Sequence, residues 1–135
     1  MKWPLSIAIV RHGQSTYNEL REKKRKDPEY RRFCEEYNRG PSSRLRAMAR
    51  KMQLKYALKT SDYGTPLSQE GIRQARITGG RFHQCGLPRP RVIFVSPYVR
   101  TKQTLEHMIE GGFDTDGVKI VYDDRIREQE HGLSL

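Results

Sequence analysis

Three short polar blocks contain the side-chain types that phosphoryl chemistry needs. Arg11 and His12 directly follow an apolar run, and Arg100 stands in the block SPYVR. Glu128 stands in a third block, DRIRE. Guanidinium groups bind phosphate oxygens through paired hydrogen bonds, an imidazole can attack phosphorus, and a carboxylic acid can protonate a leaving group. Gly13 would let the backbone approach a phosphate without an intervening side chain. Together these residues favour a site for phosphoryl chemistry.

The elements that must position these blocks form an alternating pattern. Apolar, β-branched runs predict strands over residues 5–10, 91–96 and 118–123, and helical patterns fill residues 69–86 and 97–112. This order predicts an α/β domain with a parallel sheet. Ligands bind beyond the carboxyl ends of such strands, so the three polar blocks should meet at one edge of the sheet.

A strongly basic segment separates the first block from the rest of the chain. Residues 19–59 hold 14 Lys/Arg against 6 Asp/Glu and therefore carry +8 of the net charge of +10. Within this insert, about 19–60, residues 28–37 and 43–59 predict a pair of amphipathic helices. We interpret their charge first as a solvated helix face, with a substrate lid or a surface for a polyanion as alternatives.

The rest of the composition narrows the class of protein. Cys34 and Cys85 lie far apart, outside any disulfide or zinc spacing, and predict free thiols in a reducing compartment. The first residues, MKWPLSIAIV, do not resemble a signal peptide, and no run approaches the ~18 apolar residues of a membrane span. The sequence therefore predicts a cytoplasmic protein without a membrane segment.

Four blocks resemble a known family in order and spacing. RHGQSTYN, TPLSQEGIRQA, SPYVRTKQT and RIREQEHG are similar to the motifs of the histidine phosphatase superfamily, also called the phosphoglycerate mutase-like family. The REQ within the last block resembles the mutase-like phosphatases of plants and fungi. The resemblance implies one domain over residues 1–135 with a three-layer α/β fold and a mainly parallel sheet.

The resemblance also implies a role for each candidate residue. His12 would be the nucleophile and would become a phosphohistidine, Arg11 and Arg100 would hold the phosphoryl oxygens, and Glu128 would donate a proton. Substrate-binding positions would be Gly13, Ser15 and Asn18. No metal and no cofactor would be needed, because the arginines supply the positive charge.

The chain departs from the family pattern in two ways. The family has a second pocket histidine, whereas His83 and His107 fall within predicted helices and His131 belongs to the Glu128 block. We expect that the second histidine and the last strands of the sheet lie in sequence that this chain lacks, so that the fold is incomplete at its C-terminus. The insert is the second departure, because the family joins its first two blocks by a short loop.

These observations predict a metal-independent phosphatase that hydrolyses a phosphomonoester through a phosphohistidine at His12. One alternative is a phosphotransferase of the phosphoglycerate mutase type. Another is a catalytically disabled scaffold that binds polyanions or RNA through the insert, whose aromatic residues stand among arginines. The expected partner is a small phosphorylated substrate, rather than a nucleic acid or a membrane, and the family often forms homodimers.

Overall fold

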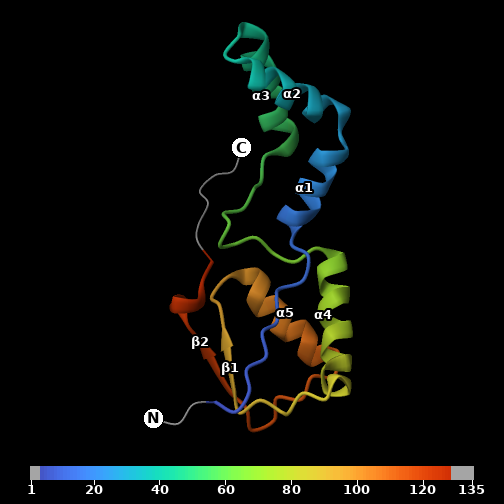
Figure 1. The fold of residues 1–135 in the computed structure, drawn as a ribbon, viewed down its shortest axis with the longest axis vertical. Helices are drawn as coiled ribbons and strands as arrows, with labels where there is room; N and C mark the ends of the chain where they lie inside the picture. Colours follow the sequence, from blue (N-terminus) through green and yellow to red (C-terminus); the bar gives the residue numbers. More distant parts are fainter. Residues whose placement is uncertain (1–3, 129–135) are drawn as a thin grey trace.

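The computed structural model describes residues 4–128 (Figure 1). Its elements are α1 (Thr16–Lys26), α2 (Pro28–Arg39), α3 (Ser43–Tyr56), α4 (Gln69–Arg81), η1 (Phe82–Cys85), β1 (Val92–Val95), α5 (Val99–Glu110), β2 (Lys119–Tyr122) and η2 (Asp124–Ile126). Within these residues, no helix is long and apolar enough to cross a membrane. Cys34 and Cys85 are free thiols, as predicted.

The two strands form a parallel sheet, which confirms the predicted α/β class. β1 and β2 pair with Ile93 opposite Ile120, and α5 connects them along the chain. Ile93 packs against a core cluster that lies between the sheet, α4 and α5: Ala75, Phe82, Val95, Leu105, Met108 and Phe113. On the other face of β1, Val92 and Phe94 are 41% and 58% exposed. The described sheet is therefore covered by helices on one face.

α4 and α5 lie side by side (Figure 1) because glycines allow their backbones to touch. A Cβ atom on Gly79 would lie 2.0 Å from the carbonyl oxygen of Met108, and one on Gly111 would lie 2.0 Å from that of Arg76. The pair Gly79-Gly80, which looks like a weak point in a helix, is thus the place where the two helices cross most closely. α4 ends at Arg81, before the predicted end of the helix; the chain continues as η1, which the left-handed Gly86 closes as predicted, with a φ of 69°.

The prediction of a strand over residues 5–10 is wrong for the described structure. The sheet contains only β1 and β2 within residues 4–128, and residues 5–10 form no ladder with either strand. Leu5, Ile7 and Ile9 are 106%, 77% and 92% exposed. An apolar run predicts burial, but a strand also needs a neighbour whose backbone groups it can pair with.

The insert forms three helices, not the predicted two. α1 begins directly after the first polar block, where Ser15 and Asn18 form a reciprocal capping box. α1 and α2 bury no residue, and α3 buries only Met52. Contacts between α2 and α3 are both polar and aromatic: Lys55 pairs with Asp27 at 2.7 Å and with Glu29 at 3.2 Å, and Tyr30 packs against Tyr56.

Asp27 makes the stability of the insert sensitive to acid. Its carboxylate caps α2 and accepts hydrogen bonds from Lys55 and Tyr56, and these contacts lower its pKa well below the ordinary value of 3.8. A lowered carboxyl pKa adds stability that is present above the ordinary value and is lost as the pH falls through the folded-state value. We therefore expect the helices of the insert to weaken below about pH 4.

Thermal unfolding of the Asp27→Asn variant, followed by circular dichroism, measures this effect. We expect a lower Tm than the parent chain at pH 7, and a difference that shrinks toward zero as the pH falls below 3.8. Glu106→Gln is the matched control, because Glu106 is exposed on α5. A difference in Tm that stays constant over the whole pH range would contradict the assignment of this acid sensitivity to Asp27.

Candidate active site

The first polar block crosses the N-terminus of α4 and is fixed there by backbone contacts. Gly13 N–H donates to Thr104 Oγ1 at 3.2 Å, and the carbonyl of Gln14 accepts from Ser68 N–H at 2.9 Å. A Cβ atom on Gly13 would lie 2.4 Å from the carbonyl oxygen of Gly71. The sequence analysis assigned Gly13 to contact with a phosphate. Its packing against α4 is a separate reason why this position requires a glycine.

The ring of His12 has a defined hydrogen-bonding state. Its Nδ1 lies 2.7 Å from the carbonyl oxygen of Gly13. A carbonyl oxygen can only accept, so Nδ1 carries the proton, and in the neutral imidazole the lone pair is on Nε2. The ring is half-buried at the end of an extended segment. His12 therefore presents a basic nitrogen that could act as a nucleophile.

An open groove with a volume of about 450 Å³ begins at Arg11 and His12. Asn18, Arg21, Glu22 and Arg25 of α1 form one wall. Gln14 and Gln74 complete the lining. Arg11 and His12, which are adjacent in the chain, both line the groove, and the insert contributes to it through its first helix.

Ser15 and Asn18 hold the start of α1. Ser15 is 2% exposed, and its hydroxyl accepts from Asn18 N–H at 3.2 Å. Ser15 N–H in turn donates to Asn18 Oδ1 at 3.1 Å. Both side chains therefore have a structural role, which the spacing S-x-x-N could have indicated from the sequence. Asn18 also lines the groove, whereas Ser15 does not appear in its wall.

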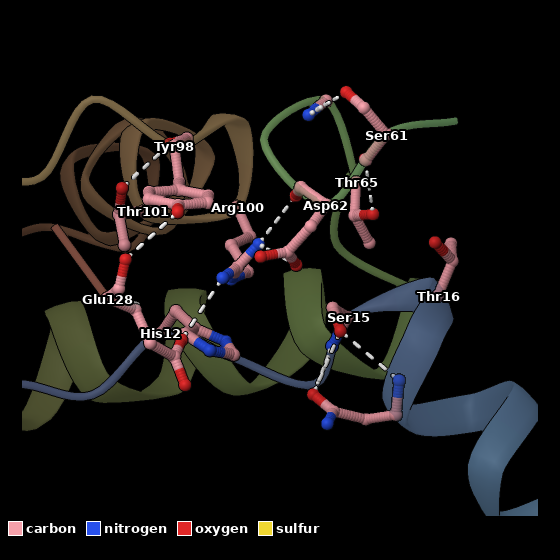
Figure 2. A network of polar contacts seen from close by, with 12 residues as sticks. His12, Ser15, Thr16, Ser61, Asp62, Thr65, Tyr98, Arg100, Thr101 and Glu128 are labelled. Carbon is pink, nitrogen blue, oxygen red and sulfur yellow. Dashed lines mark hydrogen bonds and ion pairs between the residues drawn. The ribbon is translucent and has the colours of Figure 1, made fainter. Parts of the chain in front are cut away.

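Arg100 is a buried residue at the centre of a polar network (Figure 2). It is 5% exposed, and its Nη1 donates to the carbonyl and carboxylate oxygens of Asp62 at 2.8 and 3.1 Å. Nη2 donates to Glu128 Oε2 at 3.1 Å. The guanidinium carbon lies 4.3 Å from the centre of the Tyr98 ring, whose hydroxyl donates to the Glu128 carbonyl at 3.0 Å. Arg100 and Glu128 thus meet, as the sheet-edge argument predicted.

Figure 2 shows the His12 ring beside this network, with no drawn interaction between them. Neither Arg100 nor Glu128 lines the groove that begins at His12. The predicted residues therefore form two adjoining groups, Arg11 with His12 and Arg100 with Glu128. Within residues 4–128, no group of three or more His, Cys, Asp or Glu side chains is placed to hold a metal ion.

Asp62 is a member of the network that the sequence analysis missed. It lies in the turn SDYG that follows the insert, and Arg100 Nη1 bonds both its carbonyl and its side chain. The acidic residue in a turn just before TPLS was the available signal. Of the other histidines, His83 lies in η1 and His107 in α5, as predicted, and His131 lies outside the described residues.

Comparison with sequence models of protein families identifies the superfamily of this chain. The sequence model of the histidine phosphatase superfamily (branch 1) matches residues 53–134, more than half of the chain. The chain belongs to this superfamily. The matched residues contain Arg100 and Glu128, whereas His12 and the first part of the insert precede them. The match therefore covers the part of the chain that contains Asp62, Arg100 and Glu128, and not the part that contains Arg11 and His12.

Solved structures similar to this superfamily member include three named SixA. The protein from Nakamurella multipartitia, assigned as a phosphohistidine phosphatase, is 26% identical with a TM-score of 0.42, over 52% of this chain and 37% of that one. The corresponding protein from Agrobacterium tumefaciens is 26% identical with a TM-score of 0.42, over 50% and 41%. A protein histidine phosphatase SixA complexed with tungstate is 25% identical with a TM-score of 0.40, over 48% and 41%. The matched part of the chain thus spans about two fifths of these proteins. No curated protein matches the chain.

Proposed function

We propose that this chain hydrolyses phosphomonoesters without a metal ion, through a phosphohistidine intermediate on His12. The observation that carries the proposal is the Nδ1 contact of His12 with the Gly13 carbonyl, which leaves the lone pair on Nε2. Membership of the histidine phosphatase superfamily supports the phosphatase class. The position of His12 beside Arg11 in an open groove supports its role toward an anionic substrate.

The reaction would proceed in two displacements. Nε2 of His12 forms a bond to phosphorus while the bond from phosphorus to the ester oxygen breaks, and a carboxylic acid gives its proton to that oxygen. Water then attacks phosphorus and gives a proton to the same carboxylate, the N–P bond breaks, and inorganic phosphate leaves with the carboxylic acid restored. Arg11 and Arg100 would bind the non-bridging oxygens and stabilise their charge in both transition states.

Glu128 is the proposed proton donor, and its present contact suggests how it becomes available. Arg100 Nη2 donates to Glu128 Oε2, while Nη1 is held by Asp62. A phosphate oxygen can replace the Glu128 carboxylate as the acceptor at Nη2, which frees the carboxyl group for the leaving oxygen. Asp62 keeps the guanidinium oriented during this exchange. Among the small polar residues, Asn18 is the proposed phosphate contact, because it lines the groove, whereas Ser15 is 2% exposed and does not line it.

Trapping of the intermediate tests the proposal. The 135-residue chain is mixed with 32P-labelled p-nitrophenyl phosphate in EDTA and is quenched in alkali, which preserves phosphohistidine. We expect release of p-nitrophenol and one labelled peptide, containing His12, whose label is lost in acid. His83→Asn is the matched control and should label normally, because His83 lies in η1. Turnover without an acid-labile label would overturn the proposed intermediate.

A further inference from the structure

One face of α1 carries two arginines without an ionic partner. Asn18, Arg21, Glu22 and Arg25 follow the spacing i, i+3, i+4, i+7 and all line the groove. Within residues 4–128, neither Arg21 nor Arg25 forms a hydrogen bond or ion pair through its side chain. Elsewhere on the same helix, Lys23 pairs with Glu19 at 2.8 Å. Both unpaired arginines on this face of α1 therefore lie along the groove.

The charges along this groove are arranged to attract an anion. Three arginines and one glutamate line it. Glu22 accepts a hydrogen bond from Gln14 Nε2 at 3.3 Å instead of pairing with an arginine. Like charges one turn apart on a helix face destabilise it slightly, so Arg21 and Arg25 do not stabilise α1 through each other. A negative group between the two guanidinium groups would remove that repulsion.

The length of the helix sets the distance between this arginine pair and the phosphoryl site. At 1.5 Å per residue, Arg21 and Arg25 lie about 9 and 15 Å along the helix axis from Ser15. His12 precedes Ser15 by three residues and lines the same groove as the two arginines, so a second anionic group held by them would be on the order of 10 Å from the phosphoryl group. Neighbouring phosphates on a small sugar are too close together to fill both positions. Roughly three residues of an extended peptide span the distance.

We propose that the groove binds a phosphorylated peptide segment, with Arg21 and Arg25 holding an acidic side chain about three residues from the phosphorylated one. The proposal rests on the proposed function for the phosphoryl end of the groove. Asn18 also lines the groove, and its amide nitrogen suits a carbonyl oxygen of a peptide backbone.

The aromatic residues of the insert favour a peptide over a nucleic acid. Tyr30 and Phe33 pack against each other with ring centres 5.9 Å apart, and Tyr30 packs against Tyr56 at the same distance. Phe33 also contacts Tyr37 at 6.4 Å. Among residues 4–128, no aromatic side chain lines the groove. Bases of a single strand bind by stacking on aromatic rings, so this groove suits a peptide better than a nucleic acid.

Two phosphoserine peptides of equal length test the proposal, one with aspartates and one with asparagines three and four residues from the phosphoserine. We expect the full chain to show roughly a tenfold higher kcat/KM for the acidic peptide at low salt, declining as salt screens the charges. In the Arg21→Gln/Arg25→Gln double variant this preference should fall to about one. Arg46→Gln/Arg50→Gln on α3 is the matched control, because it has the same charge change and spacing on an exposed helix face.

Fluorescence anisotropy of the two labelled peptides separates this proposal from the proposed function, since binding needs no turnover. The same preference and the same variant pattern in binding would support the arginine site even if neither peptide is hydrolysed. Equal affinity for both peptides, or equal effects of the two double variants, would overturn it. A further outcome is that a single-stranded oligonucleotide displaces the acidic peptide and binds more tightly than it does. If both double variants weakened oligonucleotide binding equally, the result would overturn the peptide site and identify the insert as a nucleic-acid surface.

Discussion

The His12→Ala variant should lose p-nitrophenyl phosphate hydrolysis by at least roughly 10³-fold in kcat, because removal of a catalytic nucleophile typically costs more than the loss of any single binding contact. We expect this loss because Nε2 is the only atom proposed to form a bond to phosphorus. The neighbouring arginines can bind phosphate oxygens but cannot replace the nucleophile. The His12 side chain is half-buried and bonds only the adjacent carbonyl, so we expect its removal to leave the fold intact.

Steady-state kinetics in EDTA, together with the circular dichroism spectra of both chains, measure this effect. The His83→Asn variant serves as the control for a histidine lost elsewhere, in η1, and should retain the parent rate. A His12→Ala chain that is folded and hydrolyses the substrate at more than about a tenth of the parent rate would contradict a nucleophilic role for His12.

The Gly79→Ala variant should be destabilised by about 2 kcal/mol or more, although alanine is the better helix former by about 1 kcal/mol. The new methyl group would lie 2.0 Å from the carbonyl oxygen of Met108, which is backbone and cannot rotate away. α4 and α5 would have to separate, and the apolar contacts of Ala75 and Met108 beneath the crossing would loosen. The free-energy cost of separating the two helices therefore exceeds the gain from the higher helix propensity of alanine.

Thermal unfolding measures this cost, and a loss of about 2 kcal/mol corresponds to a Tm lowered by roughly 8 °C for a chain of this size. Thr78→Ala is the matched control, because Thr78 is the preceding residue on α4 and is exposed. We expect its stability to change by less than about 0.5 kcal/mol. An equal or higher Tm for Gly79→Ala would show that the helices can move apart freely.

The elements that could be predicted are those whose local signals agree with their packing. Ser68 caps α4 and Gly86 closes the segment after it, and both strands β1 and β2 are short apolar runs that do pair. Residues 5–10 have the same apolar character but lack a paired neighbour in the described structure. Composition predicts that a segment can be a strand, whereas pairing depends on what lies beside it.

α1 could not be found from hydrophobic periodicity, because it buries no residue. Its only sequence signal is the cap formed by Ser15 and Asn18. Among the site residues, Arg100 and Glu128 could be predicted to meet, since both follow parallel strands. Asp62 could be noticed as an acidic residue in a turn, but its contact with Arg100 could not be predicted, because that contact depends on how the chain returns from the insert.

The lack of buried side chains in α1 and α2 also bears on how the protein fluctuates. Cooperative local opening costs least where few apolar contacts are lost, so amide protons of these two helices should exchange with solvent long before those of α4 and α5, which surround the core. α1, which forms one wall of the groove, is therefore the part of the groove that opens most easily. A ligand that bridges α1 and His12 would slow amide hydrogen exchange in α1. Its affinity would be lower than its contacts alone imply, because binding must also order this helix.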